Sequence, residues 1–180
     1  KATGRSTLAY AREKLFEPLG IDRVSWAKDP RGIYVGGNNL AMRPRDMARF
    51  GQLYLDRGRW GDEQVVPWQW VDESTQPIAR TWRGGGYGYL WWMRPSEERG
   101  AYQASGYGGQ YIYISLSADL VIVITSTEAS KGRQWRRDLF ALIRDGVIGS
   151  LGERHRLRTR AAPPPQESSL LGRTARLPGS

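Results

Sequence analysis

Two runs of β-branched and aromatic residues, separated by only three residues, constrain the fold of this chain more than any other feature. Residues 110–116 (QYIYISL) and 120–127 (LVIVITST) have the composition of strands, and so short a connection joins antiparallel neighbours. The segment LVIVIT is apolar on both faces, which is typical of a central strand covered on both sides. The sequence therefore predicts an antiparallel sheet with this hairpin at its centre.

Helical patterns precede and follow this hairpin. Ser6 can cap a first helix, and Pro44 and Pro67 suit the first turns of two others. Helices are predicted over 6–17, 44–57, 67–74 and 132–148, a long loop over 21–42, and a third strand over 87–93 beside 110–116. The last helix presents Trp135, Leu139, Leu142 and Ile143 on the face expected to cover the sheet. This order predicts an α+β fold, an antiparallel sheet with covering helices.

The helix over 44–57 has an apolar stripe of Met47, Phe50, Leu53 and Tyr54, whereas Arg45, Asp46 and Arg49 are expected on a solvated face. Three strands and one covering helix would leave one face and one edge of the sheet open. Because the first residue is Lys rather than Met, the chain is expected to be the C-terminal part of a larger domain.

The formal net charge of +9 is concentrated in part at the C-terminal end of the chain. Residues 151–180 hold six Arg against two Glu, together with three consecutive Pro, and are predicted to be a disordered basic tail following a folded part over 1–150. The body interleaves acidic and basic residues and has no nucleic-acid-binding motif, so no nucleic-acid partner is predicted. No apolar run reaches 18 residues, so no membrane span is predicted.

The nucleophile inventory excludes several enzyme classes. The chain has no Cys, and its single His, His155, lies in the predicted tail. These facts exclude thiol nucleophiles, a Ser-His-Asp triad within the folded body, and metal sites built on thiolates or several His. No metal or cofactor is predicted, and a hydrolase of this kind needs a proton carrier other than His.

Five blocks, taken together in their order and spacing, resemble the serine β-lactamase and penicillin-recognising hydrolase superfamily. The resemblance is to the class C-like branch with the family VIII esterases and the 6-aminohexanoate-dimer hydrolases, the last group above all. It covers residues 1–148 approximately and implies the C-terminal portion of a β-lactamase-like (transpeptidase-like) fold. The blocks are REKLFEPLGI (12–21), GGNNLAMRPRDMARFGQLYL (36–55), VVPWQWVDEST (65–75), YGYLWW (87–92) and ASGYGGQYIYISLSADLVIVIT (104–125).

The resemblance implies a serine hydrolase that cleaves a small amide or ester through an acyl-enzyme. In such relatives a Ser-x-x-Lys helix and a Tyr-x-Asn loop lie upstream of the EPLG block, and here only about sixteen residues precede that block. Both elements are therefore expected to be missing, and the upstream part of the same enzyme is the predicted partner. This chain alone is expected to be inactive.

A third family element, the Lys-Thr-Gly-like strand, is expected at Ala104-Ser105-Gly106. Gly permits close approach of the backbone to a scissile carbonyl, and Ala in place of the cation argues against β-lactam carboxylate binding. The backbone N–H of Tyr107 is the predicted oxyanion donor. The alternative is that SGYGG is only a bulged turn into a strand. Predicted substrate-binding residues are Ala104, Ser105, Gly106, Gly108, Gly109, Gln110, Gly36 and Gly37.

Other segments have less specific patterns. Ser25-Trp26-Ala27-Lys28 is a literal Ser-x-x-Lys, but Pro30 disfavours a helix there, so a surface loop without a catalytic role is expected. Gly36 and Gly37 either line the pocket or form a plain turn. Tyr34, Trp91 and Trp92 either line an acyl pocket or belong to the core. The alternative for the whole chain is a non-catalytic α+β binding module with an aromatic-lined groove.

Overall fold

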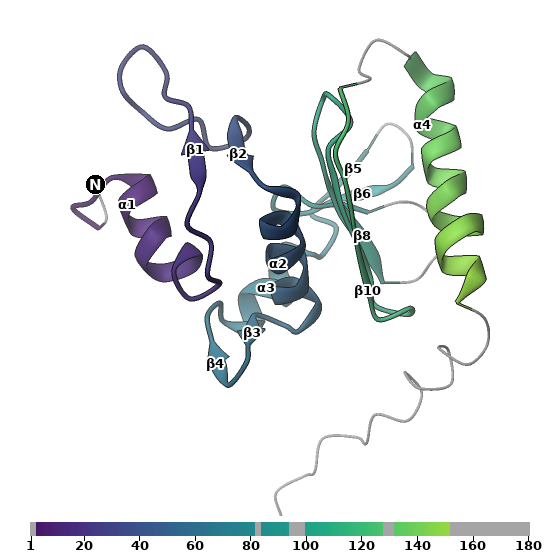
Figure 1. The fold of residues 1–180 in the computed structure, drawn as a ribbon, viewed down its shortest axis with the longest axis horizontal. Coiled ribbons are helices and arrows are strands. Elements are labelled where there is room, and N and C mark those ends of the chain that lie inside the picture. Colours follow the sequence, from purple (N-terminus) through teal and green to yellow (C-terminus); the bar gives the residue numbers. More distant parts are fainter. Residues whose placement is uncertain (1–2, 82–83, 94–99, 128–131, 152–180) are drawn as a thin grey trace, which may run out of the picture.

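A computed structural model describes residues 3–81, 84–93, 100–127 and 132–151 (Figure 1). The predicted tail over 151–180 lies outside these ranges, apart from Leu151. The elements are α1 (Thr7–Ala11), the π-helical η1 (Arg12–Phe16), β1 (Val24–Trp26), β2 (Leu40–Met42), α2 (Pro44–Leu55), β3 (Arg59–Trp60), β4 (Glu63–Gln64), α3 (Trp68–Ser74), β5 (Ala79–Arg80), β6 (Gly86–Tyr87), β7 (Trp92–Met93), β8 (Ala101–Ser105), β9 (Tyr111–Ser115), β10 (Leu120–Ile124), α4 (Gly132–Ala141) and the π-helical η3 (Leu142–Ile148).

The main sheet confirms the antiparallel hairpin but corrects its place. Its strand order is β10-β9-β8-β7-β6-β5, with each pair antiparallel, so the apolar strand β10 lies at an edge of the described sheet rather than at its centre. Strand β8, which was not predicted, lies between β9 and the 87–93 region. That region is not one strand, because the chain turns at Leu90, which has φ +68°, and separates β6 from β7.

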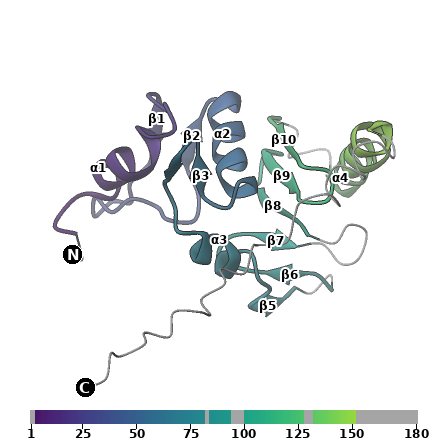
Figure 2. The ribbon, with the colours of Figure 1, turned by 90° about the horizontal axis from the view of Figure 1, so that it is seen from below.

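Both faces of the sheet carry a helix, contrary to the expectation of one open face. Ile112 and Ile114 of β9 pack with Tyr54 of α2, whereas Tyr111 contacts Phe140 of α4 with ring centroids 5.4 Å apart. Because alternate strand residues point to opposite faces, α2 and α4 cover opposite sides of the sheet, as Figures 1 and 2 show. The expected deficit was wrong because the stripe of α2 had not been assigned to the sheet.

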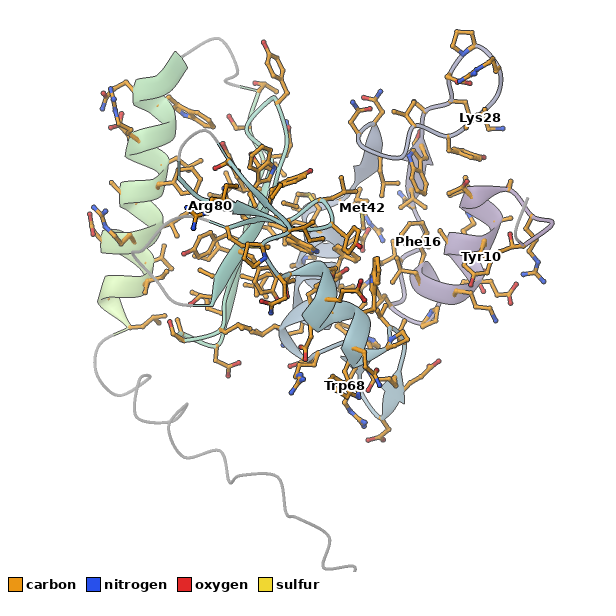
Figure 3. All side chains as sticks on the ribbon, turned by 180° about the vertical axis from the view of Figure 1, so that it is seen from behind. Tyr10, Phe16, Lys28, Met42, Trp68 and Arg80 are labelled. Atoms are coloured by element: carbon orange, nitrogen blue, oxygen red, sulfur yellow. The ribbon has the colours of Figure 1, made fainter. Side chains whose placement is uncertain are left out.

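Helix α2 also packs against the N-terminal part of the chain. Phe16, Leu19 and Ile21 form a second buried cluster with Leu53 of α2. Figure 3 shows Phe16 on the inner side of the N-terminal helix, which Ser6 caps through a hydrogen bond from the Ala9 N–H. The segment 21–42 is not a plain loop as predicted, because β1 and β2 pair antiparallel within it.

Asp46 corrects a second expectation. It was predicted on a solvated face, but its side chain is only 1% exposed, and it accepts hydrogen bonds from Arg43 Nε at 2.7 Å and from Arg49 Nη1 at 3.3 Å. A carboxylate this buried requires such paired cations. The Asp22 carboxylate and Asp46 together raise the pKa of Arg43, with the Asp46 hydrogen bond as the largest cause.

The covering face of the last helix differs from its prediction at one position. Ile143 is buried and Trp135 and Leu139 are half-buried, as expected, but Leu142 is 60% exposed. The helix changes from α to π geometry at Leu142. Phe140, absent from the predicted set, supplies the ring contact with Tyr111.

Candidate functional site

Residues 106–110 join β8 to β9 in a tight turn that holds most of the predicted site. The Gly106 N–H donates to the Gln110 carbonyl at 2.8 Å, and the Gly109 N–H donates to the Gly106 carbonyl at 3.2 Å. The loop between the paired residues Gly106 and Gln110 consists of Tyr107, Gly108 and Gly109. Gly109 has a φ of +90°. A left-handed residue at the end of a three-residue hairpin loop is what such a turn requires, and Gly provides it without steric cost.

Tyr107 lies at the tip of this turn and is 85% exposed. The hydrogen bonds that close the turn use the N–H groups of Gly106 and Gly109, and the Tyr107 N–H has no partner among the residues the structure describes. An unpaired N–H at an exposed turn tip can donate to an oxygen atom of a bound molecule. The geometry is therefore compatible with the predicted role of this N–H, which stays a prediction.

Two residues of the Lys-Thr-Gly-like element lie at the end of β8, not at the start of the 110–127 hairpin. Ala104 is half-buried and packs against the hydrophobic cluster of α2 and the sheet, whereas Ser105 is exposed. With Ala at position 104, the element has no side-chain cation on the core-facing side of the strand. A substrate carboxylate would find no ion-pair partner from this residue.

Gln110 was predicted to bind substrate, but its side chain lies against the turn itself. Its Nε2 donates to the Ser126 carbonyl at 2.7 Å. A Cβ atom added to Gly106 would lie 2.7 Å from Gln110 Oε1, and one added to Gly108 would lie 2.7 Å from Gln110 Nε2. The amide thus occupies the space that any larger residue at these two positions would need.

Gly36 and Gly37 are not brought together with the 106–110 turn. They lie in the loop between β1 and β2, which form a two-stranded sheet separate from the main sheet. A Cβ atom at either glycine would meet no atom within 4 Å. A role in lining the same pocket stays untested, with no contact here to support it.

The three aromatic residues proposed for a pocket wall also lie apart. Trp91 is buried in the core between α2 and the sheet, with its ring centroid 4.6 Å from that of Tyr54. Trp92 is partly exposed and packs on Tyr87. The ring centroid of Tyr34 lies 5.7 Å from that of Trp26, the last residue of β1. The core interpretation holds for Trp91, and these rings do not form one shared wall.

The literal Ser-x-x-Lys motif lies on an extended segment. Ser25 is exposed in β1 opposite Ala41, and Lys28 Nζ lies 4.7 Å from the centroid of the Tyr34 ring. Side chains three apart on extended backbone point to opposite sides, whereas this chemistry needs one helical turn between Ser and Lys. Figure 3 shows Lys28 in the loop that extends away from the sheet.

Trp135 contacts this turn, although it was not among the predicted site residues. A Cβ atom added to Gly109 would lie 2.4 Å from Trp135 Cη2 and 3.2 Å from the Cβ of Ser126. The indole of α4 therefore packs directly on the turn. Its place in the apolar stripe of 132–148 was the available signal, but periodicity does not tell which strand or turn a helix residue contacts.

Comparison with known proteins identifies the family of this chain. The family model described as Beta-lactamase matches residues 1–144. The chain belongs to the β-lactamase family. A curated relative, the 6-aminohexanoate-dimer hydrolase of Paenarthrobacter ureafaciens, is 25% identical over 147 residues, which are 75% of this chain and 37% of that protein. The chain thus spans well under half of the length of this β-lactamase-family relative.

Solved structures share the fold of this β-lactamase-family chain. A candidate 6-aminohexanoate-dimer hydrolase from Bacillus anthracis superposes with a TM-score of 0.71 at 24% identity, over 84% of this chain and 40% of that one. An octameric penicillin-binding protein homologue from Pyrococcus abyssi gives 0.54 at 22% identity, over 71% and 35%. No helix in the described part of the chain is long and apolar enough to cross a membrane.

Proposed function

We propose that this chain is the oxyanion-side part of a β-lactamase-family serine hydrolase that cleaves a small amide or ester through an acyl-enzyme. The observation that carries the proposal is the β8–β9 turn, in which the exposed residue Tyr107 lies between glycines, in a chain of this family. The carbonyl oxygen of the substrate becomes negatively charged when a nucleophile attacks, and the Tyr107 N–H stabilises that charge. Removing one such donor typically costs about 10²–10³ in rate.

The nucleophile and base are proposed to come from an upstream part of the same enzyme, as a Ser-x-x-Lys helix and a Tyr-x-Asn loop. The chain spans only 37% of its curated relative. The apolar strand β10 has no pairing partner on its outer side within the described sheet, and long apolar edges are normally covered. The Oε1 of Gln103 is buried without a donor among the described residues. A donor from the proposed upstream part of the enzyme would satisfy it.

The substrate is proposed to be a linear amide or an ester rather than a β-lactam. Ala104 offers no cation to a carboxylate, and the curated relative is named as a hydrolase of a 6-aminohexanoate dimer rather than of a β-lactam. A substrate that needs no carboxylate partner at residue 104 therefore suits the β8 side of the site.

The test joins this chain to its upstream coding sequence and measures kcat/KM for p-nitrophenyl butyrate, a linear 6-aminohexanoate dimer and nitrocefin. We expect turnover of the first two to exceed that of nitrocefin, and a clear preference for nitrocefin would contradict the substrate class. The 180-residue chain alone should show no burst with the ester, and Ser25→Ala should change nothing. A folded, extended protein without any turnover would favour the binding-module alternative.

A further inference from the structure

Gln110 and Trp135 contact the same glycine turn from different parts of the chain. Gln110 begins β9's side of the turn, and its amide lies against Gly106 and Gly108 while donating to the Ser126 carbonyl. Trp135 belongs to α4, and its indole lies where a Cβ atom of Gly109 would be. All three glycines of the turn are therefore in contact with one of two well-anchored side chains.

Anchoring matters because glycine is the residue with the greatest backbone freedom. A turn that contains Gly106, Gly108 and Gly109 would by itself sample many orientations of the Tyr107 N–H. A donor to an oxyanion must be held about 2.7–3.1 Å from the oxygen, and a displacement of about 1 Å can cost about 10²-fold in rate. Some other part of the protein must therefore restrict this turn.

We propose that Gln110 and Trp135 are positioning residues that fix the direction of the Tyr107 N–H. This inference rests on the proposed function for its catalytic consequence, but the ordering of the turn is measurable without catalysis. Gln110 restrains the turn through the Ser126 carbonyl, and thus through the end of β10. Trp135 restrains it through α4, so the helix that covers the sheet also reaches the site.

The first experiment measures ¹⁵N backbone relaxation in the full 180-residue chain. In Gln110→Leu, which keeps the approximate volume but removes the donor, the order parameter of the Tyr107 amide should fall from about 0.85 toward 0.6. Exchange of the Gly109 N–H should become about three- to tenfold faster. The matched control is Gln134→Leu, which removes a Gln of α4 that bonds Asp138 and should leave the turn unchanged.

A second variant guards against loss of folding and tests the hydrogen bond itself. In Gln110→Glu the new carboxylate cannot donate to the Ser126 carbonyl at neutral pH, so the turn should loosen. Below about pH 4 the carboxyl group is protonated and can donate again, so the order of the turn should recover. Trp135→Phe should give a smaller loss of order than Gln110→Leu. A Tyr107 amide that stays rigid in both Gln110 variants would overturn the proposal.

The catalytic consequence is measured in the extended enzyme. Gln110→Leu should lower kcat by about 10- to 100-fold with KM changed by less than about threefold, because the lost interaction is used in the transition state. An inactive extended enzyme would refute the proposed function, while the relaxation data would still decide whether the turn is held by Gln110 and Trp135. Unchanged kcat in a variant with a loosened turn would refute the positioning role alone.

Discussion

Two glycine-rich segments of this chain look alike in sequence and differ in structure. In the 106–109 turn, a Cβ atom at Gly106, Gly108 or Gly109 would lie within 3 Å of a neighbouring side chain. In the loop between β1 and β2, a Cβ atom at Gly36 or Gly37 would meet nothing within 4 Å. The first segment needs glycine because its surroundings are full, whereas the second lies in open space.

The difference shows that a glycine-rich motif has structural meaning only together with what packs on it. The β1–β2 loop is organised by a side chain instead, since the Asp29 carboxylate accepts hydrogen bonds from the N–H groups of Arg31 and Ile33, each at 2.9 Å. In the described part of the chain, the hydrogen bonds and ring contacts of that loop stay within the β1–β2 region. The 106–109 turn instead contacts α4 and the end of β10.

The largest expected effect is that of Gly109→Ala. The new methyl group would overlap the Trp135 indole at a residue with φ +90°, so backbone strain and overpacking together should cost about 2–4 kcal/mol of unfolding free energy. Urea denaturation followed by circular dichroism measures the loss.

Gly32→Ala is the matched control for that change, since Gly32 has φ +80° and open space around its Cβ position. It should lose only about 1–2 kcal/mol, the cost of the left-handed backbone alone. Equal losses in the two variants would show that contact with Trp135 contributes nothing.

Gly106→Ala should have an intermediate effect. The atom it would meet is the end of a flexible side chain, Gln110 Oε1 at 2.7 Å, which can swing away if it gives up its hydrogen bond to the Ser126 carbonyl. The expected loss is about 0.5–1.5 kcal/mol, the net value of one hydrogen bond. In a Gln110→Ala background the same substitution should cost less, and a double-mutant cycle measures this coupling. Full additivity would contradict the contact.

Acid should affect the β1–β2 loop and spare the glycine turn. Hydrogen bonding from the Ile33 backbone, and then from Arg31, holds the pKa of Asp29 below its ordinary value. A carboxyl group with a lowered pKa contributes stability above its unfolded pKa of about 3.9, and this is lost as pH falls through the folded pKa. An NMR titration should therefore shift the Arg31 and Ile33 amides below about pH 3.9 and leave Gly106 and Gly109 in place. Asp29→Asn should abolish the titration; a persistent shift would assign it to another group.

The smallest effects are expected for Gly36→Ala and Gly37→Ala. Neither glycine has a positive φ, and neither has a close neighbour, so the folded state should accept a methyl group without strain. Restricting the unfolded chain should leave stability unchanged or raise it by up to about 1 kcal/mol. Thermal unfolding of the two variants measures this. A loss above about 1 kcal/mol would show that the open loop is occupied in solution by contacts not described above.

Local pattern was enough to predict much of the fold. Composition, hydrophobic periodicity and the positions of Pro and Gly predicted the β9–β10 hairpin, helices α1 to α4 and the cap at Ser6. Strand β8 was missed because AYQAS has no β-branched residue, and its place in the sheet depends on β9 and β7 beside it. The turn at Leu90 was missed because part of it depends on a distant residue, the Tyr89 N–H donating to the Ser74 carbonyl at 3.0 Å.

In the candidate site, too, local features could be predicted from the sequence and features set by tertiary contacts could not. The sequence SGYGG indicated a bulged turn as the alternative to a site strand, and a turn is found there because the left-handed conformation of Gly109 is a local property. The orientation of Gln110 was not predicted, because its side chain bonds the carbonyl of Ser126, which follows it by 16 residues. Burial of Asp46 had a signal in Arg43 and Arg49, each three residues away, but only tertiary packing decides whether such a group faces water.

The position of helix α2 affects how this chain unfolds. Phe50 packs against both hydrophobic clusters, the one beneath the sheet and the one beneath the N-terminal helix. Separating either layer from α2 exposes part of the other, so the two layers should behave as one cooperative unit rather than as independently fraying pieces. The amide protons in the middle of α2 should therefore exchange with solvent only when the whole unit unfolds, and their exchange rates report its global stability.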